Sequence, residues 1–428
     1  MERMHRRAWL KRVGAAGAAL NILRAAEPAK SGPSRPPAIL LYSGWATHNI
    51  GDIGHTPGTL RYLTEYFPEA RVTCWLRKSS PAVMAMLRQR FPAVPLIENA
   101  ELAADGKATT SELQTAFDAA DLFIQNSGMH FTRFWQPPTG LLKACIARGK
   151  PFGLYGQTFD GFRAEDAAAL PGLLSRAAFI FCRDNESLHF LRGAGVTPPV
   201  LEFGPDGCFG IDVRDDAKAA TFMRAGALEP RKFICVILRT DKEVGKSPAD
   251  ALEGPPGGPE EWAAKLREVI VEWVKRTGLR VALVPEVEKE IGPMKRMILD
   301  PLPGDIRAHV IHRETFWNAD EAVSLYAQAH TVVAVEPHSC IMALAMGTPI
   351  IHFATRRHGY KAWMFRDIGL PEWLIDIDTE PASRVTTALN RIHAHYDLAR
   401  DKVKRAMQFV NTRSAEMVGE VRRAIGKQ

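Results

Sequence analysis

The sequence has few cysteines, no close pair of them, and no long apolar run. The six cysteines lie far apart along the 428 residues and form no C-x-x-C pair. This spacing excludes a disulfide framework and a cysteine-based zinc site, so we expect buried free thiols. No run of about 18 apolar residues occurs, so the sequence predicts no membrane-spanning helix.

The chain also lacks the signatures of a nucleic-acid-binding protein. Its net charge is +7, but lysines and arginines are interleaved with aspartates and glutamates along the whole length. No aromatic RNA-binding motif, zinc-finger spacing or basic leucine-zipper pattern occurs. We therefore expect a solvated basic surface and no nucleic-acid partner. The basic balance would suit anionic substrates or peripheral association with an anionic membrane surface, and no pattern indicates an oligomeric state.

Residues 1–37 are predicted to be a leader and linker. Arg6 and Arg7 precede a mild apolar run, Val13–Leu23, which resembles a twin-arginine export signal. Arg24 interrupts the apolar run, and Glu27 stands where a cleavage site needs a small residue. A flexible or amphipathic leader is the alternative.

After the leader, strand and helix patterns alternate in two series. The first series has predicted strands at Ala38–Tyr42, Arg71–Leu76, Asp121–Gln125, Phe152–Tyr155, Ala178–Cys182 and Val200–Phe203. The second has them at Phe233–Leu238, Arg280–Pro285, Ala308–Ile311, Thr331–Val335 and Pro349–Phe353. Strands separated by helices indicate parallel sheets covered on both faces.

The fold class is therefore α/β, with two doubly wound Rossmann-like domains facing a cleft. We predict domains at residues 38–215 and 230–381 and a basic, helical C-terminal tail at 382–428. Single helices are expected at Gly58–Phe67, Ala164–Leu174 and Val287–Leu299, and a Pro- and Gly-rich loop at Ser247–Pro259.

One strand-to-helix turn is especially informative. The buried strand Thr331–Val335 ends at Glu336, and the helix Ser339–Met346 follows Pro337-His338. In open α/β sheets, ligands bind outside the carboxyl ends of the strands, and the N–H groups of a helix start attract anions. His338, Glu336 and Ser339 are therefore candidate site residues for a phosphorylated or carboxylated molecule.

The segment Asn49–Gly58 is predicted to be a loop after the first strand. Gly51 would permit a tight turn there. Asp52, His48 and His55 offer acid–base or hydrogen-bonding groups. A structural turn in which Asp52 caps the next helix is the alternative.

Two arginines follow other strands. Asp184 can cap a helix, which would leave Arg183 free to face the cleft and grip a phosphate or carboxylate. An ion pair between Arg183 and a carboxylate is the alternative. Arg239 and Lys242 would also suit an anion, although a charged surface turn explains them equally well. The histidines show no metal-ligand spacing, so no metal is expected.

In this order, the motifs at the strand ends resemble those of the polysaccharide pyruvyl transferase family over roughly residues 38–380. They are Asn49-Ile50-Gly51-Asp52, Asp121–Gly128, Arg183-Asp184-Asn185-Glu186-Ser187, Asp206-Gly207-Cys208-Phe209, and Glu336-Pro337-His338 with Ala345-Met346-Gly347-Thr348-Pro349. The resemblance implies a glycosyltransferase-B-like (GT-B-like) pair of domains. It also implies transfer of the carboxyvinyl unit of phosphoenolpyruvate to a sugar of a cell-surface polysaccharide, with release of phosphate.

The resemblance assigns roles to particular residues. Arg183 and Arg239 would supply positive charge to the donor, and His338 would act as an acid or contact the phosphate. Asp52 would be the base for the sugar hydroxyl. Asn49, Gly51, Gly128, Glu336 and Ser339 would contact substrate, with phosphoenolpyruvate as co-substrate and no further cofactor.

Two positions depart from the family pattern. The family has an arginine two residues before the histidine, where this chain has Glu336, and its Gly-rich loop is here Asn126-Ser127-Gly128. Glu336 could instead bind a ribose or sugar hydroxyl, as in nucleotide-sugar-dependent glycosyltransferases. A catalytically silent glycan-binding relative is the other alternative. Because both donors are cytoplasmic, we expect the protein in the cytoplasm, at the inner face of the membrane if it binds there, with export by the leader as the alternative.

Overall fold

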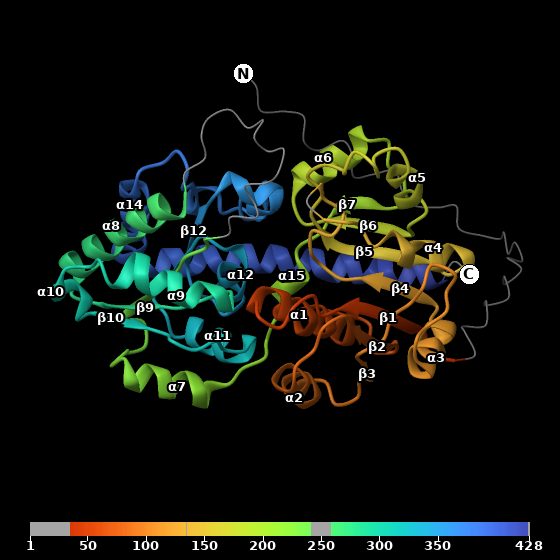
Figure 1. Ribbon diagram of the computed structural model, residues 1–428, viewed down its shortest axis with the longest axis horizontal. Coiled ribbons are helices and arrows are strands. Elements are labelled where there is room, and N and C mark those ends of the chain that lie inside the picture. Colours follow the sequence, from red (N-terminus) through yellow and green to blue (C-terminus); the bar gives the residue numbers. More distant parts are fainter. Residues whose placement is uncertain (1–34, 134, 241–257, 427–428) are drawn as a thin grey trace, which may run out of the picture. The chain divides into compact units, whose positions relative to one another are not determined.

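The computed structural model describes residues 35–133, 135–240 and 258–426 (Figure 1). Residues 36–428 form one compact unit, which contains two parallel sheets. The predicted leader and the loop Ser247–Pro259, apart from its last two residues, lie outside the described residues. The predicted domain limits, 38–215 and 230–381, stay predictions.

The N-terminal sheet has seven parallel strands in the order β3-β2-β1-β4-β5-β6-β7. Their bounds are β1 Ala38–Ser43, β2 Arg71–Leu76, β3 Leu96–Ile97, β4 Leu122–Gln125, β5 Phe152–Gln157, β6 Phe179–Cys182 and β7 Leu201–Phe203. The central strands β4, β5 and β6 are buried along their whole length. Continuous apolar runs of this kind form in parallel sheets because helices cover both faces.

The C-terminal sheet has six parallel strands in the order β10-β9-β8-β11-β12-β13. Their bounds are β8 Phe233–Ile237, β9 Arg280–Leu283, β10 Val310–His312, β11 Thr331–Ala334, β12 Ile350–Ala354 and β13 Leu374–Asp376. Both sheets thus have the doubly wound α/β order that the sequence predicts, with the short strands β3 and β13 added.

Helices cover the sheets and end in a long C-terminal helix (Figure 1). Those of the first half are α1 Ile50–Tyr66, α2 Pro81–Arg90, α3 Ser111–Ala119, α4 Thr139–Ala147, α5 Leu170–Leu174, α6 Asn185–Gly193, η1 Gly207–Gly210 and α7 Asp216–Ala225. Those of the second half are α8 Pro259–Thr277, η4 Glu288–Glu290, α9 Ile291–Met294, η5 Lys295–Leu299, α10 Gly304–Arg307, α11 Ala319–Tyr326, α12 Pro337–Ala345, η6 Arg356–Trp363, α13 Met364–Asp367, η7 Pro371–Trp373, α14 Ala382–Ala394 and α15 Tyr396–Gly426.

The predicted loop Asn49–Gly58 is wrong, because α1 begins at Ile50. Its glycines and Pro57 disfavour a helix in isolation, but tertiary packing requires them. A Cβ on Gly58 would lie 2.1 Å from the carbonyl oxygen of Gly207, and one on Gly54 would lie 2.6 Å from Met342 Cε. The glycines therefore let the start of α1 pack closely against η1 and α12.

Two other predicted helices are shorter than expected. Val287–Leu299 is split into three short helical segments, η4, α9 and η5, in a stretch that contains the helix breakers Gly292 and Pro293. Ala164–Leu174 is helical only in α5, which begins beside Pro171, where proline fits a first turn.

Main-chain hydrogen bonds join the two halves beside the start of α1. The N–H of Ile50 donates to the carbonyl of Glu286 (3.0 Å), and the N–H of Glu288 donates to that of His48 (2.9 Å). Asn49 and Val287 form an antiparallel bridge between these bonds. The first strand-to-helix turn of one sheet is thus fixed to the segment after β9 of the other.

The helical tail confirms the prediction and also connects both halves. α15 is 31 residues long and follows α14, which packs against α8. Arg413 of α15 forms an ion pair with Glu202 of β7 (3.0 Å), and Asn411 accepts a hydrogen bond from Tyr62 of α1 (3.1 Å). All six cysteines are free and buried, as expected. None of the helices in the described ranges is long and apolar enough to cross a membrane.

Candidate functional site

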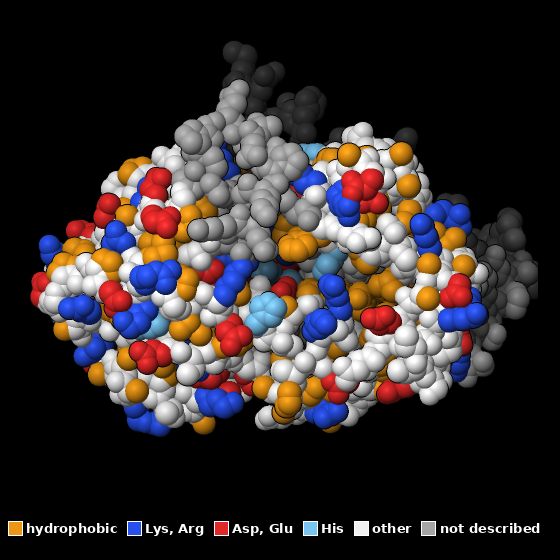
Figure 2. Space-filling view, viewed as in Figure 1, with side chains coloured by type: hydrophobic (Ala, Val, Ile, Leu, Met, Phe, Trp, Pro, Cys, Tyr) orange, Lys and Arg blue, Asp and Glu red, His pale blue; other side chains and the backbone are white. Residues whose placement is uncertain are grey.

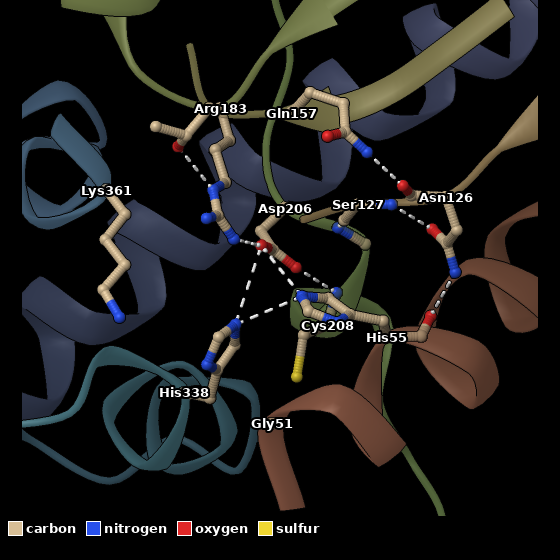
Figure 3. Close-up of polar contacts among 12 residues, drawn as sticks. Gly51, His55, Asn126, Ser127, Gln157, Arg183, Asp206, Cys208, His338 and Lys361 are labelled. Atoms are coloured by element: carbon tan, nitrogen blue, oxygen red, sulfur yellow. Dashed lines mark hydrogen bonds and ion pairs between the residues drawn. The ribbon is translucent and has the colours of Figure 1, made fainter. Parts of the chain in front are cut away.

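The site lies where segments from the carboxyl ends of strands in both sheets meet (Figure 3). His55 is on α1 after β1, Arg183 follows β6, and Asp206 follows β7. From the other sheet come Glu286, after β9, and His338, on the first turn of α12. All five side chains are buried, with at most 6% exposed. On the surface, histidine, lysine and arginine side chains gather near the centre of the face shown in Figure 2.

His55 and His338 are in direct contact across the two halves. Their Nε2 atoms are 3.1 Å apart, and the rings are nearly perpendicular, at 88°. Asp206 lies beside both, with Oδ2 3.3 Å from His55 Nε2 and 4.0 Å from His338 Nε2. The three polar atoms form a small triangle that water scarcely reaches.

Glu286 orients His338 from the other side of the ring. Its Oε1 is 3.3 Å from His338 Nδ1, and its Oε2 accepts hydrogen bonds of 2.7 Å from both the N–H and the hydroxyl of Ser339. Tyr326 in turn donates to that hydroxyl at 3.1 Å. Ser339, predicted to contact substrate, is thus engaged in holding the carboxylate that fixes the imidazole.

Asp206 is held by a second network. Arg183 Nη1 donates to Asp206 Oδ2 at 2.6 Å, and the N–H of Cys208 donates to Oδ1 at 2.7 Å. Burial by itself raises the pKa of Asp206, but the charges and hydrogen bonds of His55 and Arg183 outweigh it and lower that pKa overall. The carboxylate is therefore ionised and rigid.

The guanidinium of Arg183 is not free in the way that the sequence suggested. Its side chain is 1% exposed, and Nε donates to the hydroxyl of Thr158 at 2.8 Å. The alternative, an ion pair with a carboxylate, is what the structure shows, because Asp206 follows the adjacent strand β7. Asp184 caps α6 as predicted, accepting a hydrogen bond from the N–H of Ser187 at 2.7 Å. A role for Arg183 in substrate binding stays a prediction.

Glu336 lies among cationic groups next to His338. Its Oε1 is 3.3 Å from Arg239 Nη1 and 3.4 Å from His358 Nε2, and its Oε2 is 3.4 Å from Lys361 Nζ. Burial alone raises the pKa of Glu336, but Arg239, Lys361 and His358 reverse this effect and hold that pKa well below its ordinary value. Arg239 Nε also lies 3.9 Å from Oε1 of the buried Glu290, so two cations face two carboxylates in this cluster.

The remaining predicted residues lie near these networks. Asn49 is the N-cap of α1 and accepts a hydrogen bond from the N–H of Gly51 at 2.9 Å, so the alternative in which Asp52 caps this helix is wrong. Asp52 is half-buried in the first turn of α1. Gly128 follows β4, and a Cβ there would lie 2.3 Å from His130 Cε1. Their binding roles, and that of Asp52 as a base, stay predictions.

The loop after β4 that departs from the family pattern is part of the same framework. Asn126 donates to the carbonyl of His55 (3.0 Å) and to Ser43 Oγ (2.9 Å), and Ser127 Oγ accepts from the N–H of Gly207 (2.8 Å). Asn126 and Ser127 therefore position α1 and the segment that carries Asp206.

Sequence reasoning missed Glu286 and Lys361 and gave His55 and Asp206 too little weight. Glu286 lies in no recognisable motif, and Lys361 is 25 residues from Glu336. His55 was within a segment expected to be a loop, so its position on a helix face was not foreseen. Asp206 lies in the motif Asp206-Gly207-Cys208-Phe209. Its position shortly after a predicted strand could have identified it as a site residue.

Two groups of side chains could hold a metal ion among the described residues: His55, Asp206 and His338, and Glu286, Glu336 and His338. The second group is the weaker one, because Arg239 and Lys361 already neutralise Glu336. The first group combines two imidazole nitrogens with one carboxylate oxygen, a donor set that suits divalent transition metals.

Comparisons with solved structures show the fold. A glycosyltransferase from Rickettsia africae superimposes with a TM-score of 0.56 at 13% identity, covering 92% of this chain and 99% of that one. MnaA from S. aureus, solved with UDP, gives 0.54 at 13% identity, with coverage of 89% and 94%. HepE from Anabaena, in complex with UDP-glucose, gives 0.53 at 13% identity, with coverage of 90% and 98%. The architecture is therefore that of the GT-B fold.

Sequence comparisons give the family. No curated protein matches the chain significantly. The family model described as polysaccharide pyruvyl transferase matches residues 49–357, which include His55, Arg183, Asp206, Glu286 and His338. This match spans more than half of the chain and ends within η6, four residues before Lys361. The chain is thus a transferase-type protein that belongs to the polysaccharide pyruvyl transferase family.

Proposed function

We propose that this protein transfers the carboxyvinyl unit of phosphoenolpyruvate to a saccharide. The observation that carries the proposal is the position of His338. It contacts His55 at 3.1 Å and Glu286 at 3.3 Å, on the same turn as the neutralised Glu336. A positioned imidazole beside the buried cations Arg239 and Lys361 is the combination that an enol phosphate donor requires.

The proton balance of this reaction shows why it needs one group that donates a proton and one that accepts a proton. Two saccharide hydroxyls add to C2 of the donor, the C2–O bond to phosphate breaks, and C3 gains a proton to become a methyl group. One hydroxyl proton is balanced by the proton that C3 gains, and the other leaves on phosphate. In this scheme His338 delivers the proton to C3, and Asp52 accepts one from a hydroxyl.

Arg239 and Lys361 support an anionic donor in spite of Glu336. They pair with Glu336 and Glu290 and are largely buried, where charge interactions are strengthened, so an anionic donor would compete with these carboxylates for the two cations. Lys361 thus offers a cation that the family motif supplies as an arginine. Glu336 Oε1 makes ion-pair contacts but has no hydrogen-bond partner among the described residues, so it could still accept a sugar hydroxyl, and the test therefore includes both donors.

To test this, the protein is incubated with phosphoenolpyruvate and a panel of saccharides. Phosphate release is measured, and NMR detects the methyl group that C3 of the donor becomes. His338→Ala should lower turnover by about 10²–10⁴-fold, the usual contribution of a positioned acid or base. His393→Ala removes another imidazole, on α14, and should leave turnover unchanged.

Other results would replace the proposal. Turnover of a nucleotide sugar without phosphate release from phosphoenolpyruvate would assign the nucleotide-sugar-dependent activity instead. Glycan binding without turnover of either donor would assign a silent glycan-binding role. Unchanged turnover in His338→Ala would remove His338 from the mechanism.

We also propose that the reaction takes place in the cytoplasm, because phosphoenolpyruvate is made there. Cell fractionation with N-terminal sequencing tests this. A mature chain that begins near residue 30 and lies outside the inner membrane would overturn it and assign the leader to export.

A further inference from the structure

Three electron-pair donors converge at the contact between the halves. His55 Nε2 and His338 Nε2 are 3.1 Å apart, and Asp206 Oδ2 is 3.3 Å from the first and 4.0 Å from the second (Figure 3). We propose that His55, Asp206 and His338 form a binding site for one divalent transition-metal ion, with Zn²⁺ as the best match.

The spacing of the three atoms fits a coordination sphere. A point equidistant from all three lies about 2 Å from each of them, close to the roughly 2.0–2.2 Å of zinc–nitrogen and zinc–oxygen bonds. Three protein ligands leave the fourth tetrahedral position for water or substrate, as in catalytic zinc sites. The equidistant point lies in the plane of the three atoms, so a tetrahedral ion would require Asp206 Oδ2 and His338 Nε2, which are 4.0 Å apart, to approach to about 3.3 Å.

The surroundings of His338 prepare its Nε2 as a ligand. Glu286 Oε1 lies 3.3 Å from Nδ1, so the ring proton is placed on Nδ1 and the lone pair on Nε2. Metal-bound imidazoles usually have such a carboxylate behind them, which fixes the tautomer and makes the ring more basic. Ser339 fixes Glu286 with two hydrogen bonds of 2.7 Å.

His55 and Asp206 are prepared in the same way. His55 Nδ1 is buried and has no hydrogen-bond partner among the described residues, so a proton there leaves Nε2 free to bind. Asp206 Oδ1 is fixed by the N–H of Cys208 at 2.7 Å. Oδ2 carries two lone pairs, of which Arg183 uses one at 2.6 Å. The other lone pair is available to a metal ion, which would replace the contact of Oδ2 with His55.

The sequence could not reveal this set, because 151 residues separate His55 from Asp206 and 283 separate His55 from His338. The site is independent of the donor in the proposed function. An ion would occupy the lone pair with which His338 exchanges a proton, so ligation and proton transfer by His338 exclude each other.

The experiment measures metal binding by the full chain without any donor. The protein is stripped with a chelator, reloaded, and assayed for zinc content, for affinity by competition with a chromophoric chelator, and for the visible spectrum of the Co²⁺ form. We expect one ion per chain and a rise in Tm with zinc, because the ion binds the folded state. His55→Ala should weaken binding at least 100-fold, and Glu286→Gln about 10–100-fold.

A second histidine pair, with His330 buried and His393 exposed, provides the control. His330 Nε2 and His393 Nδ1 are 3.2 Å apart but belong to no three-ligand group among the described residues. His393→Ala should therefore leave zinc affinity unchanged. Wild-type protein that holds no stoichiometric zinc, or His55→Ala with wild-type affinity, would overturn the proposal. Phosphoenolpyruvate turnover is then measured separately in the stripped and loaded forms, so a failed metal site and a failed donor assignment give different results.

Discussion

Gly51 lies directly against the imidazole of His338. A Cβ on residue 51 would be 2.4 Å from Nδ1 and 2.7 Å from the Cβ of His338. Helix α1 and helix α12 can approach this closely only because residue 51 has no side chain. The contact explains why a helix with poor intrinsic propensity retains a glycine in its first turn.

Gly51→Ala should therefore displace His338. We expect a loss of about 1–3 kcal/mol of stability from overpacking and about 10²-fold in turnover from misplacement of the imidazole. Gly419→Ala in α15 is the control, since nothing lies within 4 Å of a Cβ there, and it should be neutral or stabilising. Denaturant titration and turnover of both variants check this; wild-type turnover in Gly51→Ala would refute it.

Removing the charge of Asp206 should be strongly destabilising. Asp206→Asn leaves the fully buried Arg183 without its carboxylate, which costs about 3–5 kcal/mol for a broken buried pair. Asp300→Asn breaks the half-exposed pair with Lys295 and should cost about 0–1 kcal/mol. Urea unfolding measures the free energy of unfolding of both variants. Equal losses of stability would show that the burial of Arg183 does not determine the cost of removing its partner.

Glu336→Gln should separate stability from donor affinity. The substitution removes the carboxylate between Arg239 and Lys361, while Arg239 keeps its contact with Glu290, and we expect a loss of about 3–5 kcal/mol from the broken buried pair with Lys361. The same cations should then bind phosphoenolpyruvate several-fold more tightly by calorimetry. Weaker binding of a nucleotide sugar in this variant would instead indicate that Glu336 contacts the donor.

Asp160 should make stability depend on pH. Burial raises the pKa of Asp160 to about 7; Arg133 and Lys361 lower it and Asp184 raises it, each by less. Neither carboxylate oxygen has a hydrogen-bond partner among the described residues. Between about pH 4 and pH 7 the folded state therefore binds the proton that the unfolded state has lost, and stability falls as pH rises.

Asp160→Asn should remove this slope. We expect it to be more stable than the wild type by about 1–4 kcal/mol at pH 8 and nearly equal at pH 4. The exposed Asp305→Asn is the control and should follow the wild-type curve. Unfolding free energies at several pH values provide the measurement, and a difference that does not grow with pH would contradict the argument.

The fold was predictable because both sheets are built from buried apolar strands that alternate with helices. Parallel strands place their carboxyl ends at one edge, so Arg183 and Asp206 could be expected near one another, and the predicted cleft between the two halves placed His338 of the other sheet opposite them. The orientation of Arg183 could not be foreseen, since it depends on whether Asp206 of the adjacent strand end reaches the guanidinium. The helical state of the Asn49–Gly58 segment depends on close packing against η1 and α12, which local propensity does not contain.

Glu286 could not be predicted as a site residue for another reason. It belongs to no recognisable motif, and it joins the site because main-chain hydrogen bonds place it opposite the start of α1. Lys361 likewise becomes part of the site only because η6 follows the strand beside β11.

The bridge between Asn49 and Val287 sets the distance across the site. Its hydrogen bonds belong to the main chain, and they lie next to Glu286 and one and a half helical turns before His55. The separation of the two imidazoles is therefore governed by backbone geometry and not by the side chains that perform the chemistry. Replacing His55 or His338 with other donors should change which proton or ion is held while leaving the spacing intact, which makes this site a suitable frame for redesigning its reactivity.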